Sequence, residues 1–193
     1  WRFKTDSLGP RPEFNLQATP LMVGGKLFLT AGTRRAAVAL DAATGEMLWT
    51  HSLNEGERGA AAPRQLSGRG LSYWTDGQNE RILYVTPGYQ LVALDANTGD
   101  RISGFGRDGI VDLKAELDQP VDLVTGEIGL HAAPVIARDV IIIGAAHLPG
   151  GSPRGTTNVK GYIRGFDVRT GKRLWIFHTV PRPGQFGNDT WLN

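Results

Sequence analysis

A repeated pattern of Asp, Thr, Gly and Trp constrains this chain more than any other feature of its sequence. In the copies 39–49 and 165–175, Asp is followed by Thr-Gly at the third and fourth positions and by Trp at the eighth. The copy at 93–100 keeps Asp-x-x-Thr-Gly and has Ser103 where the Trp would stand. The three Asp residues are 54 (95 − 41) and 72 (167 − 95) positions apart, and Trp1 resembles the end of a further copy.

The pattern suits a tight turn between two strands. An Asp side chain can accept backbone N–H groups within such a turn, and Gly can adopt the positive φ that the turn needs. One copy alone would indicate an ordinary hairpin turn, but three copies with Trp at a fixed offset predict a repeated structural unit. Trp1 and Trp49 lie 48 positions apart, and repeats of about 40 to 50 residues with several strands each are typical of β-propeller blades.

Apolar runs around each turn predict four short strands in each unit. The predicted strands are 18–23, 26–31, 36–41 and 47–52 in the first unit. They are 70–74, 82–86, 90–95 and 101–105 in the second unit, and 132–137, 140–146, 161–167 and 173–179 in the third. The predicted fold class is therefore all-β, a partial β-propeller with about three four-stranded blades. We expect one propeller domain over 1–193, with a blade tail at 1–14, blades at 15–53, 66–105 and 129–180, and the start of the next blade at 181–193.

The composition agrees with a turn-rich β protein and argues against several other classes. The chain has 26 Gly and 11 Pro, and its net charge of +2 is too small to favour nucleic acid as a partner. It has no Cys, which excludes disulfides, zinc-thiolate sites and a Cys nucleophile. No apolar stretch approaches the roughly 18 residues needed to span a bilayer. Because the chain starts at Trp1 without a signal peptide, we expect it to be an internal piece of a longer protein.

Two long inserts interrupt the repeat, at 106–129 and 147–160, and long loops in a compact fold are usually functional or disordered. The first insert carries four acidic residues, which we expect to form a solvated acidic loop and not a paired catalytic site. These are Asp112, Glu116, Asp118 and Asp122. The Gly-x-Gly-x-x-Gly at 104–109 follows a repeat and precedes no predicted helix, so it does not predict a dinucleotide site.

Beyond the repeats, ordered segments of the chain resemble the pyrroloquinoline quinone (PQQ) dehydrogenases, in which Ala-x-Asp-x-x-Thr-Gly-x-x-x-Trp is the tryptophan-docking motif. The matching segments are 15–21, 68–74, 131–144 and 159–167. The resemblance covers nearly the whole chain and points to the glucose-dehydrogenase-like branch through 163–167. It implies an eight-bladed propeller in which each Trp packs between neighbouring blades.

The resemblance implies four cofactor-binding residues. Gln17 takes the place of an acidic residue and can still hydrogen-bond the quinone. Arg69 lies in an Arg-Gly-Leu segment, where a guanidinium suits carboxylates or quinone oxygens. His131 stands where some members have Thr, and Asn158 can offer an amide oxygen. Each residue also has a structural alternative. Gln17 would be a polar strand residue and Arg69 a cation stacked on an aromatic ring. His131 would cap a strand end, and Asn158 would be an ordinary loop turn residue.

The resemblance also implies calcium or another divalent cation beside the quinone, with unknown ligands in this chain. The region 147–158, where relatives carry acidic or Asp-Asn ligands, has no carboxylate. Pro63-Arg64 replaces the adjacent Cys pair of the alcohol-oxidising members. The catalytic Asp base of the family is expected beyond residue 193, so no catalytic residue is predicted here.

The predicted function belongs to the parent protein, a PQQ-dependent oxidoreductase that oxidises an alcohol or sugar hydroxyl and passes electrons to a quinone, cytochrome or other acceptor. We expect residues 1–193 alone to be inactive. The resemblance implies the periplasm or the periplasmic face of the inner membrane, with any membrane anchor outside this chain. The alternative is a non-catalytic PQQ-like propeller scaffold for protein–protein interaction. Gln17 and the carboxylate-free region favour that alternative, whereas Arg69 in its segment disfavours it.

Overall fold

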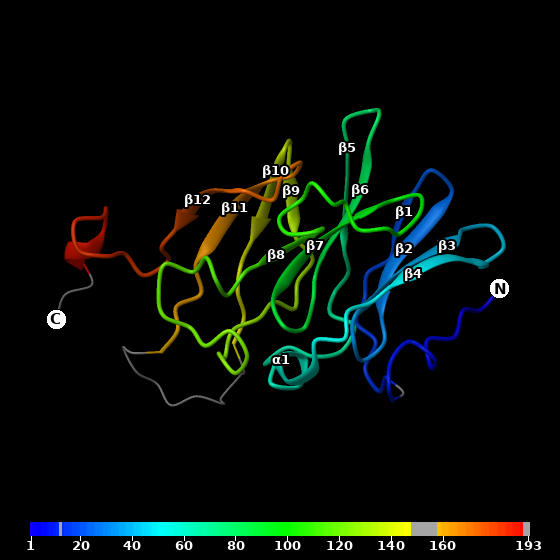
Figure 1. Cartoon of the computed structure of the whole chain (residues 1–193), viewed down its shortest axis with the longest axis horizontal. Helices are drawn as coiled ribbons and strands as arrows, with labels where there is room; N and C mark the ends of the chain where they lie inside the picture. The colour runs from blue at the N-terminus through cyan, green and yellow to red at the C-terminus, as the bar shows by residue number, and fades with distance from the viewer. Residues whose placement is uncertain (12, 148–157, 191–193) are drawn as a thin grey trace.

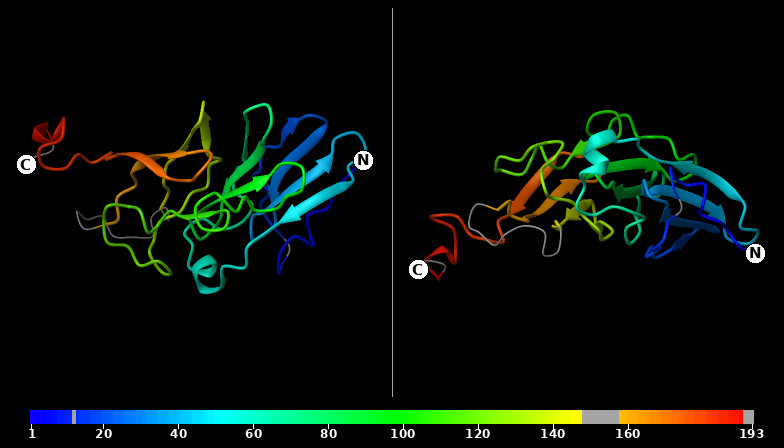
Figure 2. Two further views of the ribbon diagram at one scale, coloured as in Figure 1. Left: turned by 45° about the horizontal axis from the view of Figure 1, so that its top comes forward. Right: turned by 90° about the horizontal axis from the view of Figure 1, so that it is seen from below.

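The computed structural model describes residues 1–11, 13–147 and 158–190. It confirms the all-β prediction, because the described chain forms three four-stranded sheets with antiparallel neighbours. The sheets follow one another along the long axis of the molecule, and the described N-terminal and C-terminal segments lie toward opposite ends of that axis (Figure 1). Two further views show the same succession (Figure 2).

Each sheet is built from four strands that are consecutive in the chain. The first contains β1 (Leu21–Val23), β2 (Lys26–Ala31), β3 (Ala36–Asp41) and β4 (Met47–His51). The second contains β5 (Ser72–Thr75), β6 (Glu80–Val85), β7 (Gln90–Asp95) and β8 (Ile110–Asp112). The third contains β9 (Val135–Ala137), β10 (Val140–Ile143), β11 (Ile163–Asp167) and β12 (Arg173–Phe177). The short helices are α1 (Gly56–Ala60) and the 3-10 turn η1 (Asn188–Thr190), and no described helix is suited to crossing a bilayer.

The repeated Asp-x-x-Thr-Gly segments form the turns that the sequence predicts. Asp41 Oδ1 accepts two backbone N–H groups at 2.9 and 2.7 Å and the Thr44 hydroxyl at 3.0 Å. Asp95 and Asp167 accept the equivalent backbone groups in their turns. The glycines that end the three turns have φ between 73° and 77°. The carboxylate thus accepts hydrogen bonds from backbone N–H groups of the turn that have no partner in the neighbouring strand.

The fourth strand of the second sheet corrects the prediction for 101–105. Arg101 forms only an isolated bridge with Leu94, and the next residues turn away instead of continuing along β7. The edge of β7 is completed by β8, where Ile110 pairs with Val92. The glycines at 104, 106 and 109 explain the error, because Gly favours turns over strand interiors. The second sheet therefore ends at Asp112, beyond the predicted 66–105 limit.

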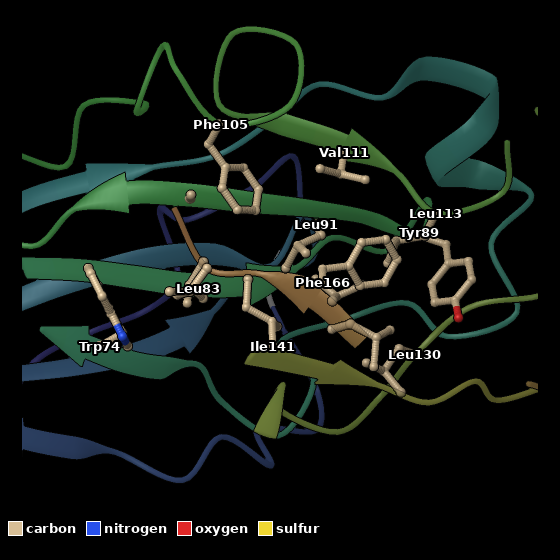
Figure 3. Packing of buried hydrophobic residues seen from close by; sticks show 14 of the residues in the cluster. Trp74, Leu83, Tyr89, Leu91, Phe105, Val111, Leu113, Leu130, Ile141 and Phe166 are labelled. Carbon is tan, nitrogen blue, oxygen red and sulfur yellow. The ribbon is translucent and has the colours of Figure 1, made fainter. Parts of the chain in front are cut away.

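The largest buried cluster joins the second and third sheets (Figure 3). Trp74, Leu83 and Phe105 from the second unit pack with Ile141 and Phe166 of the third. All five side chains are 5% exposed or less, so burying them removes a large apolar area from water. This cluster fixes the two sheets against each other.

Two indole rings, those of Trp1 and Trp49, each contact the turn of the repeat that follows in the chain. Trp49 Nε1 donates to Ala96 O at 3.2 Å, and its ring covers Gly99 so closely that an added Cβ would lie 2.7 Å away. Trp1 makes the same contacts with the turn at 42–45, at 3.2 Å to the carbonyl of Ala42. Glycine is therefore required in these turns for its positive φ and for the close approach of the ring.

The second unit, which has Ser103 instead of Trp, contacts the third unit differently. Gly106 N donates to Thr170 O at 2.8 Å, and Phe105 and Val111 approach Gly171. The loop between β7 and β8 thus occupies the position that an indole occupies at the other contact.

Candidate functional site

The chain segments that lead into the three sheets lie side by side. Thr19 N donates to Arg69 O at 3.3 Å, and Arg69 N donates to His131 O at 2.9 Å. These residues precede β1, β5 and β9, respectively. Because each unit begins at this place, residues more than 100 positions apart meet there. Three of the four predicted cofactor-binding residues are consequently brought together.

Gln17 and His131 contact each other directly. His131 Nε2 donates to Gln17 Oε1 at 2.7 Å, and His131 Nδ1 is buried without a partner among the described residues. Burial lowers the pKa of His131 below its ordinary value, and the positive charges of Arg35, Arg69 and Arg64 lower it further. His131 is therefore neutral near pH 7, and its free nitrogen can accept a hydrogen bond.

Arg69 presents an exposed side chain next to this pair, and the described residues give its guanidinium no hydrogen bond or ion pair. The flanking glycines let the backbone approach its neighbour. Gly70 has φ of 120°, and an added Cβ would lie 2.9 Å from Thr19 O. The sequence Gly-Arg-Gly thus places a planar cation at the convergence of the segments.

Asn158 lies apart from these three residues in its described contacts. Its carbonyl oxygen accepts the Lys160 ammonium at 2.6 Å. Lys160 in turn exchanges two backbone hydrogen bonds with the amide of Gln119, at 2.9 and 2.8 Å. These contacts tie the end of one insert to the other insert, whereas residues 148–157 lie outside the described part of the chain.

Arg35 is a buried residue next to the candidate site, and the sequence analysis did not identify it. It is 2% exposed and lies in the β2–β3 turn with φ of 52°. Its guanidinium donates to five carbonyl oxygens. The acceptors are those of Arg64, Gln65, Leu66, Val85 and Leu130, at 2.8, 3.4, 3.0, 2.9 and 2.7 Å. Burial lowers the pKa of Arg35 to about 10, which still leaves it charged near pH 7.

These bonds position the segments on which Arg69 and His131 stand. Leu66 has φ of 65°, a backbone conformation that costs energy for a branched residue, and its carbonyl is held by Arg35. Glu13 fixes the same region, because its carboxylate accepts Gly32 N at 2.8 Å and Ser67 N at 2.9 Å. No sequence signal separates Arg35 from the exposed Arg34 beside it.

The acidic residues of the first insert have structural partners. Asp112 is half-buried, and its two carboxylate oxygens accept hydrogen bonds from the two terminal nitrogens of Arg58, both at 2.7 Å. Burial alone would raise the pKa of Asp112, but the hydrogen bonds and the charge of Arg58 outweigh it and lower the pKa. Asp118 pairs with Arg173 at 2.7 Å. Asp122 forms another Asp-x-x-Thr-Gly turn, which belongs to none of the three sheets. The prediction of a solvated acidic loop is therefore wrong for Asp112, which is half-buried at the end of β8, and the prediction that the cluster is not a catalytic pair stays a prediction.

A metal site is not evident within the described residues, which contain no group of three or more His, Cys, Asp or Glu side chains suited to hold an ion. Asn158 offers an amide oxygen, and the sequence of 147–158 contributes no carboxylate. Arg69 supplies positive charge and planar donors, and Gln17 supplies an amide, which suit an anionic organic ligand, whereas the free Nδ1 of His131 can only accept a hydrogen bond.

Two cavities flank this region. One of about 240 Å³ is lined by His131, Pro63, Arg64 and Phe14, together with neighbouring residues. A larger one, of about 430 Å³, lies between α1 and the β2–β3 turn. The larger cavity contains none of the predicted site residues, and its Glu55 carboxylate already accepts the Thr86 hydroxyl at 2.7 Å. The smaller cavity is therefore the one associated with the candidate site.

A comparison with protein families decides the identity of this fold. The family model for PQQ proteins described as "Glucose/ethanol/alcohol dehydrogenase, beta-propeller domain" matches residues 1–193. The chain belongs to this family. The three sheets are accordingly blades of the PQQ dehydrogenase propeller, and the family resemblance seen in the sequence is confirmed.

Individual relatives of this PQQ dehydrogenase family agree. The glycerol dehydrogenase large subunit of Gluconobacter oxydans (strain 621H) is 30% identical over 95% of this chain and 25% of its own length. The quinoprotein glucose dehydrogenase of the same organism is 31% identical over 90% of this chain and 22% of its own. A quinohemoprotein alcohol dehydrogenase structure from Pseudomonas putida HK5 has a TM-score of 0.63 and 26% identity over 86% of this chain and 21% of that chain. The chain thus spans about a quarter or less of the length of these relatives.

Proposed function

We propose that residues 1–193 supply one wall of the cofactor site in a PQQ-dependent dehydrogenase that oxidises an alcohol or sugar hydroxyl. The observation that carries this proposal is the meeting of Gln17, Arg69 and His131 where three blades begin. An exposed guanidinium with no acidic partner among the described residues, beside the Gln17–His131 pair, suits a bound anion better than it suits a packed interior. The family match and the relatives named above support the same conclusion.

The residues present fit a quinone that carries carboxylates. Arg69 has a planar fork of donors that can engage a carboxylate or two adjacent quinone oxygens. Gln17 can donate through its amide without adding negative charge, and the free Nδ1 of His131 could accept a hydrogen bond from an N–H or O–H group of the ligand. When bound, PQQ would supply the group that accepts two electrons from the substrate. The chain's own residues would bind and orient it, and we assign no catalytic base within 1–193.

Other features of the proposed function rest on the family alone. They are calcium or another divalent ion as a second cofactor, a quinone or cytochrome as electron acceptor, and a periplasmic location. The indole contacts of Trp1 and Trp49 support their identity as tryptophan-docking residues. The membership in a dehydrogenase family favours the enzyme over the non-catalytic scaffold.

The test is cofactor binding by the full-length protein. PQQ and calcium are added, and bound quinone is followed by its absorption spectrum in the wild type, in Arg69→Ala and in the control Arg2→Ala, which removes an exposed Arg outside the candidate site. We expect saturable binding by the wild type and the control, and at least ten-fold weaker binding by Arg69→Ala. If the wild type binds no PQQ, the scaffold hypothesis replaces the enzyme. If Arg69→Ala binds as tightly as the wild type, Arg69 lies outside the site.

A further inference from the structure

The carbonyl group directly after the repeat Asp is the point at which a turn receives a donor from the preceding unit. Trp1 Nε1 donates to this carbonyl at Ala42, and Trp49 Nε1 donates to it at Ala96, both at 3.2 Å. Both donors are indole N–H groups of a tryptophan at the end of a repeat copy. The second unit has Ser103 at that offset, so it has no such indole to offer to the third turn.

Arg81 supplies the donor at the third turn. Its Nη1 donates to Val168 O, the carbonyl directly after the repeat Asp, at 2.9 Å, and to Arg169 O at 2.8 Å. Arg81 lies in β6, whereas Trp49 lies in β4, the last strand of its sheet. A hydrogen bond from a charged donor is stronger than one from a neutral donor, so a guanidinium can take the place of the indole N–H.

Two apolar side chains of the second unit cover the third turn in place of an indole ring. Gly171 ends this turn, and a Cβ added there would lie 2.6 Å from Val111 and 3.2 Å from Phe105. At Gly99, which ends the second turn, an added Cβ would lie 2.7 Å from the Trp49 ring. Phe105 and Val111 are both buried (Figure 3). The donor and the apolar cover of an indole are thus both present at the third turn, but they come from separate segments.

The first unit has a cation at the position equivalent to Arg81. Arg81 pairs with Asp95 across β6 and β7, and Lys26 pairs with Asp41 across β2 and β3. Lys26 also reaches the following turn, where its Nζ donates to the side chain of Asn97. Lysine offers one compact ammonium, whereas arginine offers a planar fork of donors that suits main-chain carbonyls. The position therefore points at the next turn in both units, and the residue type decides what it can hold there.

We propose that Arg81 is the docking residue of the junction between the second and third sheets, where its guanidinium replaces the tryptophan that the second unit lacks. Trp74 reinforces this junction from the inner strand β5. Its Nε1 donates to Asp139 Oδ1 at 3.1 Å, and the guanidinium of Arg169 lies 4.8 Å from the centre of its ring. The proposal concerns how neighbouring blades are held together, so it goes beyond the proposed function and does not depend on cofactor binding.

The test is hydrogen–deuterium exchange of the full-length protein, read by mass spectrometry in peptides that cover the turns at 95–99 and 167–171. We expect Arg81→Gln to speed exchange at 167–171 by at least about ten-fold, because a hydrogen bond from a charged donor contributes about a factor of ten or more to an equilibrium. Exchange at 95–99 should not change in this variant. Trp49→Phe, which removes the indole N–H and keeps an aromatic ring, should speed exchange at 95–99 and leave 167–171 unchanged.

The matched control is Lys26→Gln, at the equivalent position of the unit that keeps its indole. We expect it to leave 95–99 close to the wild type, because Trp49 still holds that turn. Arg81→Lys keeps the charge without the planar fork and should give intermediate exchange at 167–171, and it carries the test if Arg81→Gln does not fold. Unchanged exchange at 167–171 in the Arg81 variants would overturn the proposal. So would a Lys26→Gln variant that loosens its turn as much as Arg81→Gln does, since the cation would then be a general contact and not a replacement for tryptophan.

Discussion

Replacing Arg35 with Met should destabilise the protein far more than the same substitution at the neighbouring Arg34. Met is similar in length and apolar, so the change removes the guanidinium while largely filling its space. The five carbonyl oxygens that Arg35 contacts would then lose their donor. The neighbouring Arg34 is exposed, and Arg34→Met provides a control with the same chemical change at the preceding residue, outside the network.

The magnitude follows from the carbonyls that water cannot reach. Val85 and Leu130 are 2% and 6% exposed, and each buried acceptor left without a donor costs about 1–3 kcal/mol. Together they give a loss of about 2–6 kcal/mol. Against this, the lowered pKa of Arg35, about 10 instead of 12.5, means that holding the charge in its buried position costs about 3 kcal/mol, which Met would relieve. The bonds to the other three carbonyls contribute about 1.5–3 kcal/mol each, which more than offsets that relief, and the sum of all these contributions is about 4–12 kcal/mol. Because these three residues are only half-buried and water can replace part of the lost bonds, we expect a net loss at the lower end, about 4 kcal/mol.

The free energy of unfolding is measured by urea denaturation of the full-length protein, with Arg35→Lys as an intermediate variant. Lys keeps the charge but has only three donors for the five acceptors, so we expect about half the loss seen with Met. The reasoning is refuted if Arg35→Met and Arg34→Met differ by less than about 0.5 kcal/mol, the range usual for surface substitutions.

Three other substitutions test individual contacts. Gly99→Ala should lower the free energy of unfolding, measured by urea denaturation, by about 1–3 kcal/mol more than Gly24→Ala does. Both glycines have positive φ, but only at Gly99 would the added Cβ lie 2.7 Å from the Trp49 ring. Equal losses of stability would mean that backbone strain alone matters. His51 has a pKa lowered by burial and by a nearby Arg, so the unfolded chain takes up its proton first, and stability should fall as the pH drops below about 6.5. His51→Gln should show a smaller drop in Tm between about pH 7.5 and 5, and an unchanged drop would exclude His51 as its source. Arg58→Lys loses a bidentate ion pair and should lower stability by about 1–2 kcal/mol, whereas a neutral effect would show that the pair is replaceable by a point charge.

The turns between neighbouring strands were predictable from the sequence because each turn is determined by residues that are adjacent in the chain. Asp41 with its Thr-Gly predicts the turn between β3 and β4, and the structure has that turn with Gly45 at positive φ. The prediction failed at 101–105, where a glycine-rich loop replaces a strand. The sequence alone could not show that β8 would complete the sheet, since that depends on pairing across the loop.

The candidate site was predictable only in part. Gln17, Arg69 and His131 were found because they lie in segments that resemble a family, and the structure brings them together. Their role as cofactor contacts stays a prediction. Arg35 was not found, because its importance comes from acceptors up to 95 positions away and not from its own neighbours. A buried Arg that contacts only carbonyl oxygens leaves no pattern of opposite charges in a sequence.

The contact between Arg35 and Leu130 also bears on the order in which the chain folds during synthesis. Strands within each sheet are joined mostly by short turns, so a sheet can form soon after its own residues have left the ribosome. The first sheet, however, contains a guanidinium whose last acceptor is made 95 residues later. Until then, water must hydrate that charge, and this edge of the nascent first blade remains exposed to solvent. We expect this edge to remain open until the correct later segment arrives, which would protect the growing chain from premature association with the wrong sheet.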